Sequence, residues 1–353
     1  MLMETHDEGA RIKRSKWRLI LTLVTFAALA ILIYGLRKDI GGVIENLGKV
    51  NTLALLLILP IEALNYHAYT RFYIGLFKIL GEKVDYWNMY RLNLELNFVN
   101  HILPSGGVSG ISYFTVRTRA HGISGPKSTL SQLIKLLLLY ISYQPILIIG
   151  VFLLALRGHV NNLVMVVASS LITLLIVGTF GFIYMIESRS RIRTFSTVVT
   201  KAINKILSPF RRKPETINLE GAQNAFNELH DNYKLLKENW RDLKMPFLYM
   251  TIANVTEVAA VYVVYIAFGH LVNVGAVILA YAVANFAGLI SVLPAGIGIY
   301  EGLMTAVLAA TGISAALSIP VTIMYRVVNM AIQLTPGYYF YQRAVRGGLD
   351  RQK

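Results

Sequence analysis

The sequence predicts an all-α polytopic membrane protein with an inverted repeat, each unit having a re-entrant helical hairpin between spanning helices. The chain has 353 residues, of which 55% are hydrophobic and 15% charged. Several apolar runs reach the roughly 20 residues that a helix needs to cross a hydrocarbon core of about 30 Å. Two similar strings, HILPSGGVSG at 101–110 and SVLPAGIGIYEG at 291–302, interrupt such runs. Together these observations predict a bundle of spanning helices with two matching breaks.

Composition and missing motifs exclude several classes of protein. The chain contains no cysteine, which excludes disulfides, thiolate metal sites and cysteine nucleophiles. It has no P-loop string GxxxxGK[ST], no HExxH and no GxSxG, and His67, His101 and His121 lack the spacing of metal ligands. We therefore expect no cofactor, no metal site and no enzyme activity. The net charge of +15 is attributed to cytoplasmic loops facing anionic lipid, so no nucleic-acid partner is expected.

The unbroken apolar runs predict the spanning helices. The first run, residues 17–34, is longer than the apolar region of a signal peptide, which has about 7–15 residues, and is therefore interpreted as a retained helix. The predicted spanning helices are 17–36, 52–78, 129–156, 161–187, 246–269 and 316–341.

Two further regions, 86–122 and 274–312, are long enough to cross but are broken at their centres. The first contains Asn93 and Glu95 as well as the three polar residues before its break, which makes it too polar to face lipid. Non-helical backbone at membrane depth persists only where protein or water covers it. We therefore expect each region to enter the membrane and return to the same side. Full crossing by each hairpin is the alternative, and would change the assignment of sides.

The two broken regions are copies within a repeat. A shift of 190 residues places Leu103-Pro104 on Leu293-Pro294, Gly106 on Gly296, and Gly122-Ile123-Ser124 on Gly312-Ile313-Ser314; shifts of 191 and 195 place Lys135 on Arg326, Pro145 on Pro336, and Glu62 on Glu257. The first repeat is expected at 52–156 and the second at 246–341, within a single integral-membrane domain covering 1–353.

Parity and charge predict the orientation of the copies. Three crossings separate the start of the first unit from the start of the second, so the second is inverted. Basic residues concentrate before the first helix, near 117–127, in the loop 188–245 and in the C-terminal tail. The positive-inside rule places all four in the cytoplasm. We expect a protein of the cytoplasmic membrane with both termini cytoplasmic.

The loop 188–245 shows an apolar stripe at helical spacing, from Leu219 to Trp240, after a basic amphipathic segment. A helical hairpin packed under the membrane domain is the favoured interpretation. A homo-oligomer contact or a docking site for a partner enzyme is the alternative.

The hairpin tips are candidate anion sites. Proline ends the inbound helix, and glycine lets the backbone turn and a ligand approach closely. The outbound helices, near 109–121 and 299–311, would present free N–H groups and positive dipole ends to a central cavity. Tight turns that serve only helix packing are the alternative. The predicted substrate-binding residues are Arg326, Glu301, Lys135, Pro104, Ser105, Gly106, Gly107, Pro294, Gly296, Gly298, Asn97, Asn100 and His101.

Charged residues inside predicted helices are the other candidates. Arg326 lies about ten residues into its helix, where a cation costs about 2.5–3.5 kcal/mol on insertion. Lys135 is expected nearer a helix end, from which it can snorkel to the headgroups; the alternative for both is an ion pair or a lipid contact. Glu301 either caps its helix, pairs with Arg326 or binds a cationic group. Glu62 and Glu257 are candidates for proton coupling or pairing. The 20 tyrosines are attributed mostly to interfacial anchoring, and no site is assigned to them.

The strings NHILPSGGVSG, SVLPAGIGIYEGLMTAVLAATGIS and MYRVVNMAIQLTPGYYF resemble the transmembrane flippase region of lysylphosphatidylglycerol synthases. This region is the integral-membrane half of the multiple-peptide-resistance proteins and also occurs alone. The resemblance covers residues 17–345 and is strongest at LPAGIGIYEG and Arg326. Many members have an Arg and an acid just after the first proline, where this chain has Ser105-Gly106-Gly107-Val108-Ser109.

The resemblance implies translocation of a lipid between leaflets. Matched to this sequence, it points to Pro104, Gly106, Pro294, Gly296, Gly298, Glu301 and Arg326. The chain ends about ten residues after its last predicted helix, so no aminoacyl-transferase domain and no lysine transfer are expected.

The expected function is therefore an ATP-independent lipid flippase whose partner is a membrane phospholipid or another phosphate-bearing lipid. The alternatives are a secondary transporter of a small anionic solute or ion, a membrane-embedded enzyme acting on a lipid phosphate, and a non-catalytic membrane partner of a lipid- or glycan-modifying enzyme.

Overall fold

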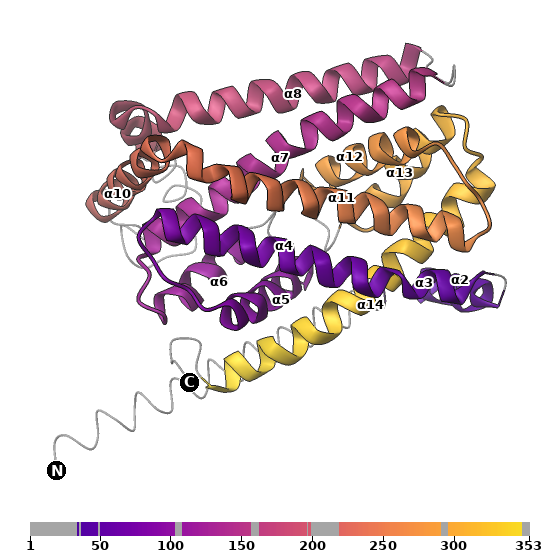
Figure 1. Cartoon of the computed structure of the whole chain (residues 1–353), viewed down its shortest axis with the longest axis horizontal. Coiled ribbons are helices and arrows are strands. Elements are labelled where there is room, and N and C mark those ends of the chain that lie inside the picture. Colours follow the sequence, from indigo (N-terminus) through magenta and orange to yellow (C-terminus); the bar gives the residue numbers. More distant parts are fainter. Residues whose placement is uncertain are drawn as a thin grey trace, which may run out of the picture.

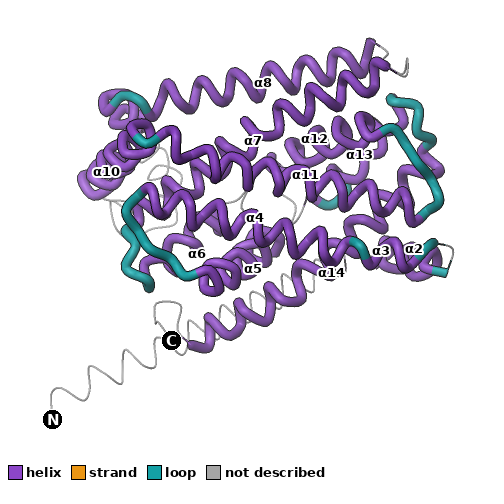
Figure 2. Tube along the Cα trace, in the orientation of Figure 1, coloured by secondary structure: helices purple, strands orange, loops and turns teal. Residues whose placement is uncertain are grey.

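The protein is a helical bundle, seen here in a computed structural model that describes residues 34, 37–48, 50–102, 108–156, 162–195, 197–198, 219–290 and 296–347. These residues form helices and contain no strand (Figures 1 and 2). The helices are α2 (Arg37–Leu47), α3 (Thr52–Leu56), α4 (Ile58–Ile79), α5 (Tyr86–Ile102), α6 (Val108–Arg119), α7 (Gly125–Leu156), α8 (Asn162–Ile186), α10 (Leu219–Glu238), the 3₁₀ helix η2 (Trp240–Leu243), α11 (Lys244–Ala267), α12 (Val274–Ile290), α13 (Ile299–Ala310) and α14 (Ala315–Gly347).

Five helical segments of the described chain are long and apolar enough to cross a membrane. They are Thr52–Ile79, Gly125–Leu156, Asn162–Ile186, Trp240–Ala267 and Ala315–Gly347. Each coincides with a span predicted from sequence, so the all-α polytopic fold is confirmed. The predicted first span, 17–36, lies outside the described residues except for Tyr34.

Each of the two broken regions forms a pair of helices with the same lengths. The inbound helices α5 and α12 have 17 residues each, and the outbound helices α6 and α13 have 12 each. At 1.5 Å per residue these helices are about 26 and 18 Å long, and both lengths fall short of a hydrocarbon core of about 30 Å. The outbound helices begin at Val108 and Ile299, close to the predicted starts of 109 and 299.

The turns that end the two outbound helices have the same local structure. Gly122 and Gly312 adopt φ values of 80° and 90°, a left-handed conformation that glycine tolerates best. The next residue in each case, Ile123 or Ile313, donates its N–H to the carbonyl five residues earlier, as in a Schellman motif. The sequence match between these two turns therefore reflects a repeated C-terminal cap.

Helices of each unit pack against helices of the other unit. Helix α5 of the first unit packs on α14 of the second, and α12 of the second packs on α7 of the first, while α4 and α11 lie along each other. Glycines permit these close approaches. A Cβ at Gly275 would lie 2.1 Å from the Gly150 carbonyl oxygen on α7, and one at Gly337 would lie 2.7 Å from the Leu94 carbonyl oxygen on α5.

The two hairpins lie in opposite halves of the molecule along its longest axis. In Figure 1, α5 and α6 lie in the half that contains α10, and α12 and α13 lie in the other half. This arrangement agrees with an inverted repeat, and the orientation of the two units in a membrane stays a prediction.

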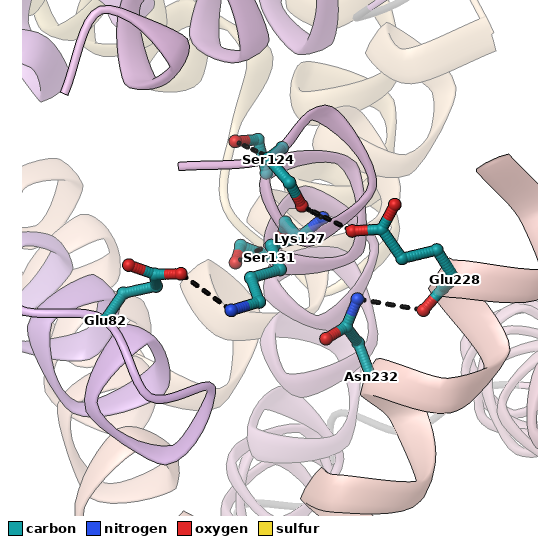
Figure 3. A network of polar contacts seen from close by, with 7 residues as sticks. Glu82, Ser124, Lys127, Ser131, Glu228 and Asn232 are labelled. Carbon is teal, nitrogen blue, oxygen red and sulfur yellow. Dashed lines mark hydrogen bonds and ion pairs between the residues drawn. The ribbon is translucent and has the colours of Figure 1, made fainter. Parts of the chain in front are cut away.

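Helix α10 is held against the membrane-spanning bundle by polar contacts near the start of α7, some of them drawn in Figure 3. Ser124 donates to Glu228 of α10 at 2.6 Å. Beside this contact, the Lys127 ammonium joins α7 to Glu82 in the loop after α4, at 2.6 Å. The predicted apolar stripe forms this helix, and Leu229 and Leu236 are buried. Trp240 is 61% exposed in η2, so its predicted place in the packed stripe is wrong.

Two apolar cores fill the bundle, and a polar layer separates them. Along α4, Ile58 belongs to one core and Phe72 to the other. The same change occurs along α14, where Tyr325 belongs to the first core and Met330 to the second. The polar residues of α4, α5, α11 and α14 fall between the two cores, and it is there that a cavity lies.

Candidate functional site

The polar layer contains a partly open cavity of about 260 Å³. Seven of the described helices contribute side chains to its wall, including α5 from the first hairpin and α12 and α13 from the second. The lining residues are Asn65, Tyr66, Tyr69, Asn93, Leu96, Asn97, Asn100, His101, Lys135, Glu257, Tyr281, Asn285, Tyr300, Tyr325, Arg326, Asn329, Met330 and Gln333. The cavity is therefore built by both repeat units together.

The wall of this cavity is polar but has few charges. Of the eighteen lining residues, seven carry carboxamides and five are tyrosines, while only Leu96 and Met330 have aliphatic or thioether side chains. Lys135, Arg326 and Glu257 are the charged members of the described wall. An intramembrane surface of this kind is costly unless its polar groups have partners, so the internal hydrogen bonds of the wall indicate which groups are already engaged.

Arg326 is held by the second hairpin. Its side chain is 5% exposed and forms an ion pair with Glu301 of α13. Its guanidinium also lies over the Tyr300 ring, 4.7 Å from the centroid. The other carboxylate oxygen of Glu301 accepts the backbone N–H of Gly298 at 2.7 Å, which caps the first turn of α13. Two of the functions that the sequence left open for Glu301, capping and pairing, are thus combined in one side chain.

Lys135 lies in the cavity wall, which corrects the expectation that it snorkels to the headgroups. Helix α7 begins at Gly125 rather than at 129, so Lys135 lies deeper in the helix than the sequence indicated. Its ammonium sits over the Tyr69 ring, 4.7 Å from the centroid. No carboxylate of the described residues forms an ion pair with it. Lys135 is therefore a cation in the polar layer that forms no ion pair within the described residues, and the Glu257 carboxylate acts on it electrostatically from a longer distance.

The two acids Glu62 and Glu257 occupy the same polar layer. Glu62 is 2% exposed and accepts a hydrogen bond from Gln333 at 2.9 Å. Glu257 lines the cavity and accepts from Asn65 at 3.2 Å and from the Tyr325 hydroxyl at 3.3 Å. Both carboxylates are thus hydrogen-bonded to α4 or α14, and neither forms an ion pair within the described residues.

Asn97 connects the first hairpin to this layer. Its amide nitrogen donates to the Tyr66 hydroxyl at 2.6 Å and to the Gln333 side-chain oxygen at 2.8 Å. His101, one turn later, has its Nδ1 2.9 Å from the Asn97 carbonyl oxygen. Asn100 lies against α6, where a Cβ at Gly110 would be 1.9 Å from its side-chain oxygen. These contacts join α4, α5, α6 and α14 around the cavity.

The structure brings together most of the site residues predicted from sequence that it describes. Six of them line the cavity: Arg326, Lys135, Asn97, Asn100, His101 and Glu257. Two more contact a lining residue, Glu301 through Arg326 and Glu62 through Gln333. Gly296 and Gly298, with φ values of 66° and 85°, precede α13 and do not line the cavity. The other five lie outside the described residues: Pro104, Ser105, Gly106, Gly107 and Pro294. The anion-binding function of the tips stays a prediction.

The main error of the sequence-based interpretation is that it assigned no tyrosine to the site. Five of them line the cavity, at 66, 69, 281, 300 and 325, although no site was assigned to tyrosine. Their positions did contain a signal. Tyr66 and Tyr69 follow Glu62 at helical spacing on α4, and Tyr325 precedes Arg326 on α14. Composition alone cannot separate such inward-facing rings from interfacial anchors.

A second buried ion pair closes the first hairpin, and sequence reasoning did not anticipate it. Glu95 of α5 is 3% exposed. It accepts from Arg117 of α6 at 2.9 Å and from the Tyr113 hydroxyl at 2.8 Å. Each hairpin thus has one buried carboxylate–guanidinium pair, within the hairpin in the first unit and between α13 and α14 in the second.

The fold and the cavity define a polytopic α-helical membrane protein in which helices of two broken pairs and four longer helices together line a polar chamber. Residues 19–337 match the family described as the lysylphosphatidylglycerol synthase transmembrane region, and the chain belongs to this family. A UPF0104 membrane protein of Methanocaldococcus jannaschii is 23% identical over 349 residues, covering 97% of this chain and 99% of the relative. A UPF0104 membrane protein of Pyrococcus horikoshii is 25% identical over 182 residues, covering 51% of this chain and about half of the relative, 54%.

Proposed function

We propose that this protein is an ATP-independent lipid translocase, which moves a phosphate-bearing lipid headgroup between the leaflets of the membrane in which it resides. The observation that supports the proposal most directly is the polar cavity built by both units inside a bundle of apolar spanning helices. Membership of the lysylphosphatidylglycerol synthase transmembrane family supports a function connected with membrane lipids.

The physical task of a flippase explains why such a cavity is needed. Acyl chains move freely within the bilayer, but a charged headgroup that enters hydrocarbon loses its hydration at a cost of several kcal/mol or more. A wall rich in carboxamides and hydroxyls replaces part of that hydration. In this proposal the headgroup crosses through the cavity while the acyl chains stay in lipid.

Lys135 provides the charge that a lipid phosphate needs. Its ammonium lines the cavity and forms no ion pair within the described residues, so a phosphate there would gain a charge-assisted contact. Arg326 is already neutralised by Glu301 and positions the second hairpin against α14. Access would alternate by rocking one unit against the other, as in transporters built from inverted repeats.

The test is leaflet exchange in proteoliposomes. The purified full-length chain would be reconstituted with a panel of headgroup-labelled phospholipids, and exchange would be followed by the accessibility of the label to an impermeant reagent. Wild-type protein is expected to accelerate exchange of a subset of lipids, and Lys135→Gln is expected to slow it at least about tenfold. Arg343→Ala, which removes an exposed cation near the end of α14, serves as the matched control and is expected to match wild type.

The outcomes discriminate between the proposal and its rivals. Lack of exchange for every lipid, with or without a proton gradient, in protein that elutes as a single species would contradict the proposal. Uptake of a small anion by the same proteoliposomes, without lipid exchange, would favour a solute transporter.

A further inference from the structure

We infer that the headgroup received by this cavity is an uncharged polyhydroxylated group, a sugar or a cyclic polyol, joined to lipid through a single phosphodiester. The inference rests on the proposed function and specifies the chemistry of its substrate. It follows from three properties of the wall: the one cation outside its ion pairs, the kind of hydrogen bonding it offers, and its size.

One cation of the described wall lies outside its ion pairs. Arg326 is paired with Glu301, whereas Lys135 forms no ion pair within the described residues. The acid in the wall, Glu257, accepts hydrogen bonds from Asn65 and Tyr325 and interacts with Lys135 electrostatically without forming an ion pair. One ammonium matches one phosphodiester monoanion. A headgroup with an additional amine would place a second cation near Lys135, and a headgroup with several phosphates would lack further cations.

The remaining wall matches hydroxyl groups better than ions. Carboxamides and phenols each offer both a donor and an acceptor, as sugar hydroxyls do. Seven carboxamides and five tyrosines account for twelve of the eighteen lining residues. A wall specific for an ammonium group would consist of acceptors and acids, and one for bare phosphate would consist of donors. The tyrosine rings add flat apolar faces against which a ring of C–H groups can pack.

The described wall has two buried side-chain groups without a hydrogen-bond partner, the Tyr300 hydroxyl and the side-chain oxygen of Asn329. The side-chain oxygen of Asn329, in a residue that is 7% exposed, accepts no hydrogen bond, although the nitrogen of the same amide donates to the Tyr325 hydroxyl at 3.4 Å. A buried acceptor left unpaired costs about 1–3 kcal/mol. A donor hydroxyl on the headgroup would satisfy it, and Asn329 lies one helical turn after Tyr325 in the wall that also contains Arg326.

The size of the cavity fits a headgroup rather than a whole lipid. At about 260 Å³ it lies just below the roughly 300 Å³ at which small-molecule sites begin. One six-membered ring with its phosphate is a molecule of that scale, and two acyl chains are not. The chains would therefore remain in the bilayer.

Binding of short-chain probes to the purified full-length protein tests this inference separately from transport. The four probes are dihexanoyl phosphatidylinositol, hexyl glucosyl phosphate, dihexanoyl phosphatidylethanolamine and dihexanoyl phosphatidylcholine, with Kd measured in detergent. We expect the two hydroxylated probes to bind at least about tenfold more tightly than the two amine-bearing probes. The tighter of the two hydroxylated probes identifies a polyol or a sugar as the preferred ring.

Variants show whether the selectivity arises in the cavity. Asn329→Leu is expected to weaken binding of the hydroxylated probes about tenfold and to leave the choline probe unchanged. Lys135→Gln is expected to weaken the hydroxylated probes more than the ethanolamine and choline probes, because it also removes the repulsion between Lys135 and their ammonium groups. Gln342→Leu, buried on the same helix but outside the cavity, is the matched control and should match wild type.

Equal affinity for all four probes, or tighter binding of an amine-bearing probe, would overturn the inference while leaving lipid translocation intact. Selective binding of the hydroxylated probes without any leaflet exchange would support the chemistry of the site and contradict the proposed function.

Discussion

Replacing Glu301 by leucine is expected to destabilise the second hairpin strongly, because two different contacts end on this carboxylate. It pairs with Arg326, whose side chain is 5% exposed, and it caps the Gly298 N–H. Removing one partner of a buried ion pair costs about 3–5 kcal/mol. Glu301 is itself 17% exposed, so the lower end of that range applies, and loss of the cap adds about 1 kcal/mol. The expected total is about 4 kcal/mol for Glu301→Leu.

The opposite single change should cost less. In Arg326→Met the carboxylate of Glu301 still accepts the Gly298 N–H and still lies at the positive end of the α13 dipole. The expected loss in the free energy of unfolding is therefore about 2 kcal/mol, the value of a charge-assisted hydrogen bond. The double variant, in which no unpaired guanidinium is created at this site, is expected to be more stable than Glu301→Leu alone. Unfolding by SDS in mixed micelles, followed by circular dichroism, gives the four free energies of this cycle.

The exposed pair between Arg189 and Asp231 provides the control. These side chains are 60% and 51% exposed, and Arg189→Leu is expected to cost less than about 1 kcal/mol. A double variant at the hairpin that is less stable than Glu301→Leu, or a Glu301→Leu cost no larger than that of the exposed pair, would refute the assignment of a buried stabilising pair.

Three further changes have defined outcomes. Lys135→Met should abolish lipid exchange while leaving thermal stability in detergent within a few degrees of wild type, since no described carboxylate forms an ion pair with it; an unchanged exchange rate would show that this ammonium does not contact the headgroup. Gly275→Val should destabilise by at least about 1–3 kcal/mol, because its Cβ would lie 2.1 Å from the Gly150 carbonyl oxygen. Gly178→Val, with open space around it, is the control for this change, and equal losses would contradict the close approach. Glu95→Leu should cost about 3–5 kcal/mol and make the α5–α6 pair the first segment to exchange amide hydrogens, which hydrogen-exchange mass spectrometry would detect.

The sequence specified the secondary structure of the hairpins well because their signals are local. Proline and glycine act on the backbone where they stand, and the outbound helices begin at Val108 and Ile299, within a residue of expectation. The matched strings at 122–124 and 312–314 belong to this local kind of signal, since Gly122 and Gly312 form equal caps. Arg326 was recognisable because a cation in an apolar helix is conspicuous.

The tyrosines of the cavity wall could not be predicted, because their place depends on which faces of seven helices converge. Tyrosine has the same chemistry at a membrane interface and in a polar interior, so the sequence around Tyr281 and Tyr300 did not indicate that they face a cavity. Lys135 was placed too near the surface because α7 begins at Gly125, four residues before its apolar run. The pairing of Glu95 with Arg117 required knowledge of how α5 and α6 lie together.

The central claim, that lipid headgroups pass through the cavity between the two hairpins, can be tested with one cysteine, because the chain has none of its own. Asn285→Cys places a thiol in the wall, and a charged methanethiosulfonate reagent would then attach a sulfonate there. His270→Cys, in the exposed loop between α11 and α12, provides the control. We predict that complete modification at 285, verified by mass, stops lipid exchange in proteoliposomes and that reduction restores it, while modification at 270 has no effect. Exchange at the unmodified rate in fully modified Asn285→Cys protein would contradict the account.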